Sequence, residues 1–292
     1  MSEKPIVLTV YLSKGGVAKS TLAALIAPWL AGQGYNVVIV DLDRQGTQSA
    51  VFNLVDDAGR PGDVLARVLK REVDALAAVR WLDDFELPRA DGVESGAFGV
   101  IEGGPSTSLA IEAIKNNPLH YKVLNTLDVL REPIHSLGGH VDVVIVDMGP
   151  SDPLLSVAGL LATDYLLIPT DSSYEAMERL AHVVGEVADV QTAHPDLKVA
   201  GVVPVMVQRY FGGLRAAKSV QIARQVLREA YGELILRDEA GEVEIPFDED
   251  WRVVRWANEY LLTSPHVKGK TKLQAERFLK AVADVIFEEV EA

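Results

Sequence analysis

Cysteine is absent from the 292 residues of the chain. Disulfides, thiolate catalysis, iron–sulfur clusters and cysteine-ligated zinc are therefore excluded. Long hydrophobic runs are also absent, because charged residues or glycines interrupt every apolar stretch before it reaches the ~20 residues that span a bilayer. The opening Met-Ser-Glu-Lys-Pro lacks the basic and apolar regions of a secretory signal, so we expect a cytoplasmic protein that does not attach to membranes.

Basic residues are scarce as well. The sequence contains 28 lysines and arginines against 42 aspartates and glutamates, which gives a net charge of -14. This balance excludes a surface coated with basic residues, so any contact with nucleic acid must be made by a local patch. Hydrophobic residues account for 48% of the chain, which is enough to form a substantial core.

Apolar, strand-like runs alternate with helical patterns along most of the chain. This alternation is typical of a doubly wound α/β fold, in which a mostly parallel sheet is flanked by helices on both faces. The expected strands are 6–12, 37–40, 98–101, 141–146, 165–168 and 199–205, and the expected helices are 19–33, 62–71, 106–116, 119–136, 153–162, 173–191, 213–231 and 270–290. We expect a single domain, 1–292, with a C-terminal helical portion, about 248–292, packed on it. We expect no separate DNA-reading module before the first strand.

A glycine-bearing loop follows the first strand and precedes an apolar helix. It reads Ser13-Lys-Gly-Gly-Val-Ala-Lys-Ser-Thr21. Such a loop supplies close backbone approach, converging N–H groups and the positive end of a helix, which are what a phosphate needs. We predict nucleotide contacts from Gly15, Gly16, Val17, Ala18, Lys19, Ser20 and Thr21. Lys19 is expected to reach the β- and γ-phosphates, Ser20 to bind Mg²⁺ and Thr21 to contact the α-phosphate.

The loop departs from the usual pattern Gly-x-x-x-x-Gly-Lys-Ser/Thr, because Ser13 and Ala18 occupy the two glycine positions. An additional lysine, Lys14, precedes the glycine pair. The departure resembles the deviant Walker A motif, Lys-Gly-Gly-x-x-Lys-Ser/Thr, of the ParA/MinD family of partition and positioning ATPases. The resemblance implies a P-loop NTPase fold of the deviant Walker A class. It also implies that Lys14 crosses a dimer interface to the partner's phosphates, which makes Lys14 and Lys19 candidate catalytic residues.

Two aspartates end the second strand, in Val40-Asp-Leu-Asp-Arg-Gln-Gly46. Alternation along a strand places Asp41 and Asp43 on the same side, and the carboxyl ends of parallel strands converge on the phosphate crevice. The segment resembles the family's Val-Asp-Leu-Asp-Pro-Gln-Gly, with Arg44 in place of proline. The resemblance implies that Asp43 orients and activates the attacking water and that both aspartates contribute to the magnesium site. The alternative is that they cap a strand end facing solvent.

A third acidic position, Asp147, ends the strand Val144-Ile-Val-Asp147, which has the Walker B form of an apolar run followed by an acid. We expect it to bind Mg²⁺ through water, because this ion keeps much of its hydration shell. The following Gly149-Pro-Ser151 is similar to the family's switch turn, and residues 162–177 are similar to its next strand and helix. The resemblance covers about residues 6–205.

The nucleobase contacts are expected after the sixth strand and in a later Ile-Pro loop, as the resemblance implies. Met206, Pro246 and Phe247 represent these segments here. An apolar side chain stacked on a purine and a packed core contact are both open at these positions. The chain contains no Asn-Lys-x-Asp motif, which reads guanine, so the expected nucleotide is ATP.

Two basic groups are candidates for a DNA contact. Arg252 and Arg255 follow the Ile-Pro loop, where partition ATPases carry arginines for DNA binding, although acidic residues precede them here. A phosphate contact and a solvated structural role are both open for these two arginines. Lys268, Lys270 and Lys272, with Arg277 and Lys280, form a second patch whose phosphate contacts would be salt-sensitive and independent of sequence. Basic residues between 209 and 228 are a further candidate, for which a solvated amphipathic helix is the alternative. The last helix ends in acidic residues, so we expect it to pack on the core rather than on anionic lipids.

Taken together, these features resemble the small ParA/Soj-type partition ATPases. The resemblance implies a weak ATPase that uses ATP and Mg²⁺, forms an ATP-dependent homodimer, binds nucleoid DNA without sequence preference and is stimulated by a ParB-like or other adaptor protein. Plasmid or chromosomal DNA is the expected cargo, and a non-DNA cargo is an alternative. A P-loop ligase or kinase of the dethiobiotin synthetase type is a second alternative. Electron-transfer and metal-delivery relatives need bridging cysteines, which the chain lacks.

Overall fold

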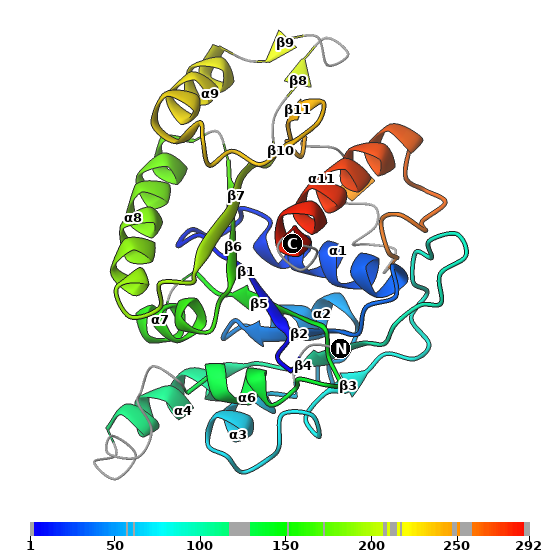
Figure 1. The fold of residues 1–292 in the computed structure, drawn as a ribbon, viewed down its shortest axis with the longest axis vertical. Coiled ribbons are helices and arrows are strands. Elements are labelled where there is room, and N and C mark those ends of the chain that lie inside the picture. The colour runs from blue at the N-terminus through cyan, green and yellow to red at the C-terminus, as the bar shows by residue number, and fades with distance from the viewer. Residues whose placement is uncertain are drawn as a thin grey trace.

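The computed structural model describes residues 3–288, except 57, 61, 117–128, 151, 172, 207–208, 211–214, 217, 247–249 and 252–258. Its central element is a seven-stranded sheet in the order β3-β4-β2-β5-β1-β6-β7 (Figure 1). The parallel strands are β1 (Ile6–Val10), β2 (Val37–Leu42), β4 (Phe98–Ile101), β5 (Val143–Met148), β6 (Tyr165–Thr170) and β7 (Lys198–Pro204). The two-residue β3 (Arg80–Trp81) pairs antiparallel with β4 at one edge.

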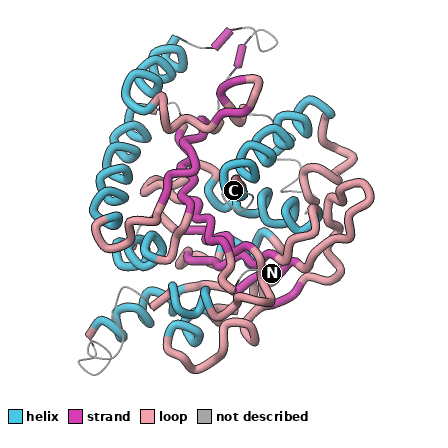
Figure 2. The backbone as a smooth tube through the Cα atoms, viewed as in Figure 1, coloured by secondary structure: helices cyan, strands magenta, loops and turns pink. Residues whose placement is uncertain are grey.

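Helices cover both faces of this sheet (Figures 1 and 2). One face carries α1 (Lys19–Gly32) and α11 (Gly269–Phe287), and the other carries α4 (Pro105–Lys115), α6 (Arg131–His135), α7 (Pro153–Leu161) and α8 (Tyr174–Gln191). The remaining helices are α2 (Thr47–Val51), α3 (Leu65–Leu69) and α9 (Lys218–Tyr231). Two small hairpins pair β8 (Arg209–Tyr210) with β9 (Arg215–Ala216) and β10 (Arg237–Asp238) with β11 (Gly241–Glu242). The predicted doubly wound, mostly parallel sheet is confirmed.

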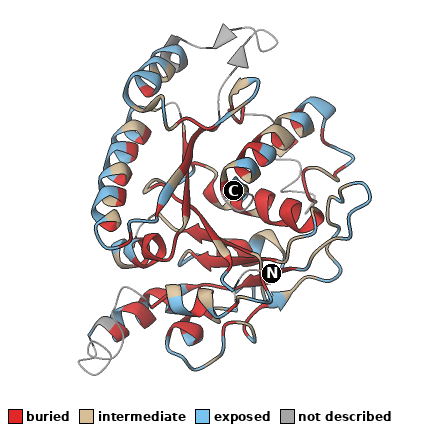
Figure 3. Ribbon diagram, in the orientation of Figure 1, coloured by how far each residue is buried: buried red, intermediate tan, exposed pale blue. Residues whose placement is uncertain are grey.

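The strands β2, β5 and β6 are buried along their whole length (Figure 3). β2 reads VVIVDL and β5 reads VVIVDM, and every residue of both strands is buried. Continuous β-branched runs of this kind suit a parallel sheet that helices cover on both faces. Each run nevertheless ends in a buried aspartate, and the parallel register pairs Asp41 directly with Asp147. The sheet therefore places two acidic side chains on adjacent strands at its carboxyl edge.

Three helix predictions differ from the structure. The helix expected over 62–71 is only α3, because Asp63 (φ 51°) and Arg71 (φ 61°) adopt left-handed backbone conformations on either side of it. The helix expected over 213–231 begins at Lys218, because 215–216 belong to β9. The helix expected over 119–136 is represented by α6, and residues 117–128 lie outside the described residues. Neither α2 nor β3 was predicted.

Candidate functional site

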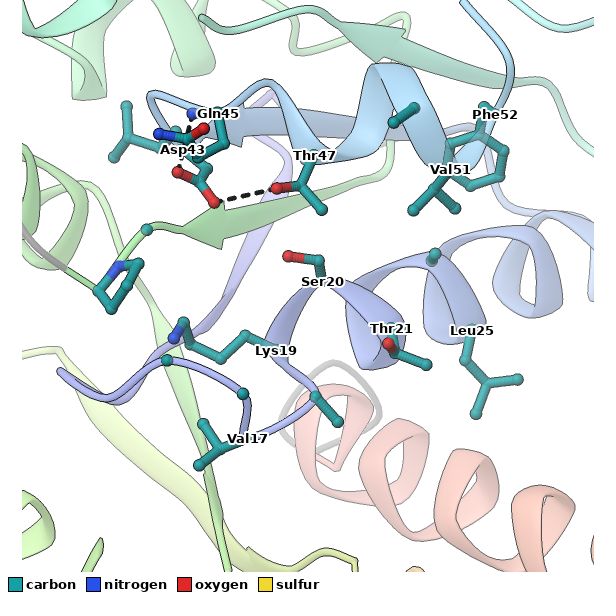
Figure 4. A pocket seen from close by; sticks show the side chains of 18 of the residues that line it. Val17, Lys19, Ser20, Thr21, Leu25, Asp43, Gln45, Thr47, Val51 and Phe52 are labelled. Carbon is teal, nitrogen blue, oxygen red and sulfur yellow. Dashed lines mark hydrogen bonds between the residues drawn. The ribbon is translucent and has the colours of Figure 1, made fainter. Parts of the chain in front are cut away.

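A cavity of about 810 Å³ opens at the carboxyl edge of the central strands (Figure 4). Segments that follow β1, β2, β5 and β7 line it, so residues far apart in the sequence meet here. Of the predicted site residues, the cavity is lined by Gly15, Gly16, Val17, Ala18, Lys19, Ser20, Thr21, Asp43 and Met206. Its size is that of a small-molecule site.

The loop after β1 turns sharply into α1. Gly16 has φ 76° and Ala18, immediately before α1, has φ 61°. A left-handed conformation costs a residue with a Cβ about 1 kcal/mol, so Ala18 holds a conformation that glycine adopts without strain. No side chain caps the first turn of α1. The first N–H groups of the helix therefore face the cavity as an anion-binding end.

Lys19 is the buried cation of the site. Its side chain leaves the first turn of α1 and runs back across the loop, below Asp43 in the view of Figure 4, and only 7% of the residue is exposed. The Nζ atom donates a hydrogen bond of 2.6 Å to the carbonyl oxygen of Lys14, so the loop closes on its own lysine. Burial lowers the pKa of Lys19, and the charges of Asp147 and Asp43 oppose that effect.

Asp43 lies at the mouth of the cavity, one residue beyond the end of β2. Its carboxylate accepts hydrogen bonds of 3.0 Å from the backbone N–H of Gln45 and from the hydroxyl of Thr47. Gly149, in the turn after β5, passes so close that a Cβ built there would lie 2.9 Å from Oδ1 of Asp43. The carboxylate is therefore held from three sides and points into the space above Ser20.

Asp41 and Asp147 are fully buried, and neither lines the cavity. Asp41 accepts hydrogen bonds from the backbone N–H groups of Gln48 (2.8 Å) and Asp43 (3.1 Å), so it fixes the turn between β2 and α2. Burial raises the pKa of Asp41 well above its ordinary value, and the charge of Asp147 raises it further. Burial also raises the pKa of Asp147, to about 6, against hydrogen bonds from Gln48 and Ser20. Asp41 was predicted to support the magnesium site. In this geometry it would do so indirectly, by fixing the backbone of Asp43 and Gln48.

Gln48 joins these parts and was not predicted. Its fully buried side-chain amide donates to the carbonyl of Ser20 (3.0 Å) and to Oδ2 of Asp147 (2.7 Å). A neutral donor between two acceptors satisfies both without adding charge. The signal in the sequence was a glutamine shortly after Asp41 and Asp43. It was missed because no helix was expected in that segment.

The fit to Mg²⁺ rests on one unsatisfied atom. Oδ1 of Asp147 is buried and has no hydrogen-bond partner among the described residues. Within that part of the chain, no cluster of three or more acidic, histidine or cysteine side chains could hold a metal by itself. Mg²⁺ commonly takes one or two protein oxygens and completes its shell with water and phosphate oxygens, which is the arrangement that Ser20 and Asp147 suit.

Lys14 does not line the cavity and points to the start of α8. Its Nζ atom lies 2.7 Å from Oδ2 of Asp171 and 2.8 Å from the hydroxyl of Ser173. Burial raises the pKa of Asp171, but the hydrogen bonds from Lys14 and Ser173 outweigh it and hold the pKa below its usual value. Neither partner of Lys14 was predicted, although both lie in the segment that resembles the family's strand and helix.

The predicted nucleobase contacts separate. Met206 lines the cavity with a left-handed backbone (φ 53°), whereas Pro246 is buried away from it and Phe247 lies outside the described residues. Aromatic residues that were not predicted form another wall of the cavity: Phe52, Phe85, Trp251 and Tyr260. The hydroxyl of Tyr260 donates to the carbonyl of Leu25 on α1, which fixes this wall to the helix.

Some of the residues predicted to contact DNA lie outside the described residues, and the structure places the others. Arg252 and Arg255 lie outside the described residues. Lys268 and Lys270 are exposed and Lys272 is partly exposed at the start of α11, where Lys268 approaches Asp250 at 3.6 Å. Arg277 forms two hydrogen bonds of 2.7 Å with Asp238, and Lys280 is exposed.

Two other surfaces bear on the predictions. On α9, Arg224 pairs with Glu244 and Arg228 with Glu242, as in the solvated helix that was the alternative to DNA binding. α11 buries Phe278, Val282 and Ile286. Among the described residues, no helix has the length and apolar character needed to cross a membrane.

Comparison with known proteins gives a consistent result. A family model described as the CobQ/CobB/MinD/ParA nucleotide binding domain matches residues 8–242. The chromosome partitioning protein ParA of Caulobacter vibrioides is 28% identical over 238 residues, which is 80% of this chain and 80% of that protein. The maintenance of carboxysome distribution protein A of Synechococcus elongatus is 26% identical over 76% of this chain and 80% of its own. Among solved structures, apo McdA of Cyanothece superposes with a TM-score of 0.74 and 21% identity, covering 95% of this chain and 99% of that one.

Proposed function

Because the chain belongs to the CobQ/CobB/MinD/ParA nucleotide-binding family, we propose that it is a partition or positioning ATPase that works as an ATP-dependent dimer. The observation that carries the proposal is the phosphate loop, where Lys19 and the uncapped start of α1 face the same cavity as Asp43. Binding of ATP closes two copies face to face, and hydrolysis separates them.

ATP binding exchanges contacts within the loop for contacts with phosphate. The N–H groups at the start of α1 receive the phosphate oxygens, and Lys19 leaves the carbonyl of Lys14 for the β- and γ-phosphates. Burial strengthens this interaction, because the charges act in a medium of low dielectric. Thr21 contacts the α-phosphate, and Met206 packs on the adenine from the far side of the cavity.

Hydrolysis depends on charge placement rather than on covalent chemistry. Mg²⁺, held by Ser20 and, through water, by Asp147, would neutralise the charge that develops on the phosphate oxygens. Asp43 orients the attacking water, since Gln45, Thr47 and Gly149 fix its carboxylate at the cavity mouth. Lys14 of the second copy supplies the additional positive charge. Turnover is slow until an adaptor protein stimulates it.

The DNA contact is assigned to the start of α11. Lys268, Lys270 and Lys272 lie in or before its first turn, which contains no acidic residue. Cations at this end oppose the helix dipole and so do not stabilise the helix, which favours a role in binding phosphate. The likeness to the carboxysome distribution protein favours one alternative, in which the same cycle positions a cargo other than DNA.

The substitution Asp43→Ala tests the cycle. We expect the variant to bind ATP with wild-type affinity, to lose at least about 100-fold in hydrolysis and to remain dimeric in ATP. Light scattering after size-exclusion chromatography gives the mass, and phosphate release gives the rate. A variant that stays monomeric in saturating ATP and Mg²⁺ would refute the proposed dimer.

The cargo is tested separately with the same trapped variant. Binding to duplex DNA of unrelated sequences should be similar and should fall steeply with salt. The triple substitution of Lys268, Lys270 and Lys272 by alanine should weaken this binding without affecting dimerisation. Dimers that form normally and bind no DNA would favour a cargo of another kind.

A further inference from the structure

The ammonium group of Lys14 is bound within its own subunit. Its Nζ atom contacts Oδ2 of Asp171 at 2.7 Å and Oγ of Ser173 at 2.8 Å, and the side chains of Lys14 and Asp171 are only 14% and 23% exposed. Asp171 in turn accepts the backbone N–H of Ser173. A partly desolvated, charge-assisted pair of this kind is stronger than an ordinary surface ion pair.

The same two acceptors also organise the start of α8. Ser173 is the N-cap of this helix, and its hydroxyl accepts the backbone N–H of Ala176 at 3.1 Å. Asp171 has no second cation partner among the described residues, so its charge is directed at Lys14. The acceptors of the ammonium group therefore belong to the start of a helix, next to the strand (β6) that neighbours the one carrying the phosphate loop.

We propose that Asp171 and Ser173 form an internal site for Lys14 that competes with the nucleotide of a second copy. The inference rests on the function proposed above, in which Lys14 reaches the partner's phosphates. One ammonium group cannot occupy both places, so closing the dimer requires Lys14 to leave Asp171. The strength of the internal pair therefore sets the ATP concentration at which two copies associate.

The two lysines of the loop are coupled through one residue. Lys19 donates to the carbonyl of Lys14, while the side chain of Lys14 is held by the start of α8. When a phosphate draws Lys19 away, the backbone of Lys14 loses its hydrogen-bond donor, and the residue becomes easier to move. Binding of the first nucleotide within a subunit thus prepares the release of the lysine that serves the other subunit.

The variant Asp171→Asn tests the competition, because it keeps the shape of the side chain and removes its charge. We expect the ATP concentration for half-maximal dimerisation to fall about tenfold, as measured by sedimentation at several ATP concentrations in Mg²⁺. Glu175→Gln is the matched control, since it removes one negative charge from an exposed position in the first turn of α8 and leaves Lys14 untouched. This control should dimerise as the wild type does.

A second measurement reports on Lys14 directly in the nucleotide-free monomer. Acetylation by a lysine-reactive ester, quantified by mass spectrometry, should be slow at Lys14 in the wild type and several-fold faster in Asp171→Asn and Asp171→Ala. Lys70, which is exposed at the end of α3, should react equally in all the proteins. The two Asp171 variants together guard against a folding defect in one of them, and thermal unfolding establishes that each is folded.

The outcomes separate the inference from the proposed function. If the wild type dimerises with ATP but Asp171→Asn changes neither the midpoint nor the acetylation of Lys14, the internal site is refuted and the ATPase cycle stands. Faster acetylation without a shift in the midpoint refutes the competition. If neither the wild type nor Asp43→Ala dimerises, both proposals fail.

Discussion

Acidic side chains gather in two regions of the molecule, and their surroundings act on them in opposite directions. At the carboxyl edge of the sheet, burial raises the pKa values of Asp41 and Asp147. On the surface formed by α9, α11 and the β10–β11 hairpin, arginines hold the pKa values of Asp238 and Glu242 below their usual range. In the first region burial favours the protonated acids, whereas in the second region arginines of the same chain favour the ionised acids.

The hydrogen-bond donors explain the contrast. Asp41 is held by backbone N–H groups and Asp147 by the amide of Gln48, all of which are neutral. Asp238 is held by the guanidinium of Arg277. Acids that are already paired with arginines gain little free energy from a bound cation. Buried acids that are held only by neutral donors are stabilised when a cation binds.

The largest expected effect is at Lys19, the one lysine that lines the cavity among the described residues. Lys19→Ala should weaken ATP binding roughly 100-fold or more, because a buried charge-assisted contact to phosphate is lost and Asp147 and Asp43 remain. Isothermal titration calorimetry measures the affinity. Lys70→Ala, at an exposed position, should bind ATP normally, and an unchanged affinity in Lys19→Ala would place the phosphates elsewhere.

A second prediction concerns pH. The pKa of Asp147 is about 6 in the folded protein, whereas its ordinary value, which applies to the unfolded chain, is 3.8. The native state therefore binds more protons than the unfolded state between about pH 4 and pH 6, so the stability of the ligand-free protein should fall as pH rises through this window.

The variant Asp147→Asn sharpens this test. The variant should be more stable than the wild type near pH 7, and its stability should fall much less as pH rises. Part of the fall should remain, because the pKa of Asp41 is also raised. Thermal unfolding at a series of pH values measures both effects. A wild-type stability that is flat or rises over the window would contradict the assignment. The same variant should bind nucleotide less tightly in the presence of Mg²⁺.

A smaller loss, in the free energy of unfolding, is expected at Gln48. This residue supplies the neutral amide that distinguishes the buried acids from those paired with arginine. Gln48→Ala leaves the carbonyl of Ser20 and one oxygen of Asp147 without their donor, which should cost about 1–3 kcal/mol of unfolding free energy. Urea denaturation measures the change. Gln45→Ala, an exposed neighbour in the same turn, should cost less than about 0.5 kcal/mol. Equal losses in the two variants would remove the special role of the buried amide.

The smallest effect is expected on the surface formed by α9, α11 and the β10–β11 hairpin, where acids pair with arginines of the same chain. Arg277→Ala should destabilise the protein by about 0.5–1 kcal/mol, because the side chain is 40% exposed and solvent screens the pair. The loss should shrink in high salt, whereas that of Gln48→Ala should not. Lys280→Ala serves as a control for charge on the same helix. A loss in Arg277→Ala that is insensitive to salt would indicate packing rather than charge.

The parts of the site that could be predicted are the motifs formed by residues that are adjacent in the sequence. The loop from Ser13 to Thr21 and the acids that end β2 and β5 carry their chemistry in local order, and strand runs such as VVIVD have an unambiguous pattern. The structure places residues 15–21 of this loop and Asp43 around one cavity.

The remainder depends on contacts between distant segments. The pairing of Lys14 with Asp171 spans 157 residues, and that of Gln48 with Asp147 spans 99. The burial of Asp41 follows from the strand order, which places β2 directly beside β5, and no alternation along one strand contains that information. The short α3 was overestimated because left-handed residues at its two ends leave no signal in hydrophobic periodicity.

The close approach of Gly149 to Asp43 brings the turn after β5 against the end of β2. A Cβ built at Gly149 would lie 2.9 Å from Oδ1 of Asp43, so any larger residue at this position would displace the carboxylate. α7 begins four residues after Gly149, and its exposed Val157 reaches the outside of the molecule. A change at the exposed face of α7 therefore lies close in sequence to the turn that touches Asp43, a residue of the cavity.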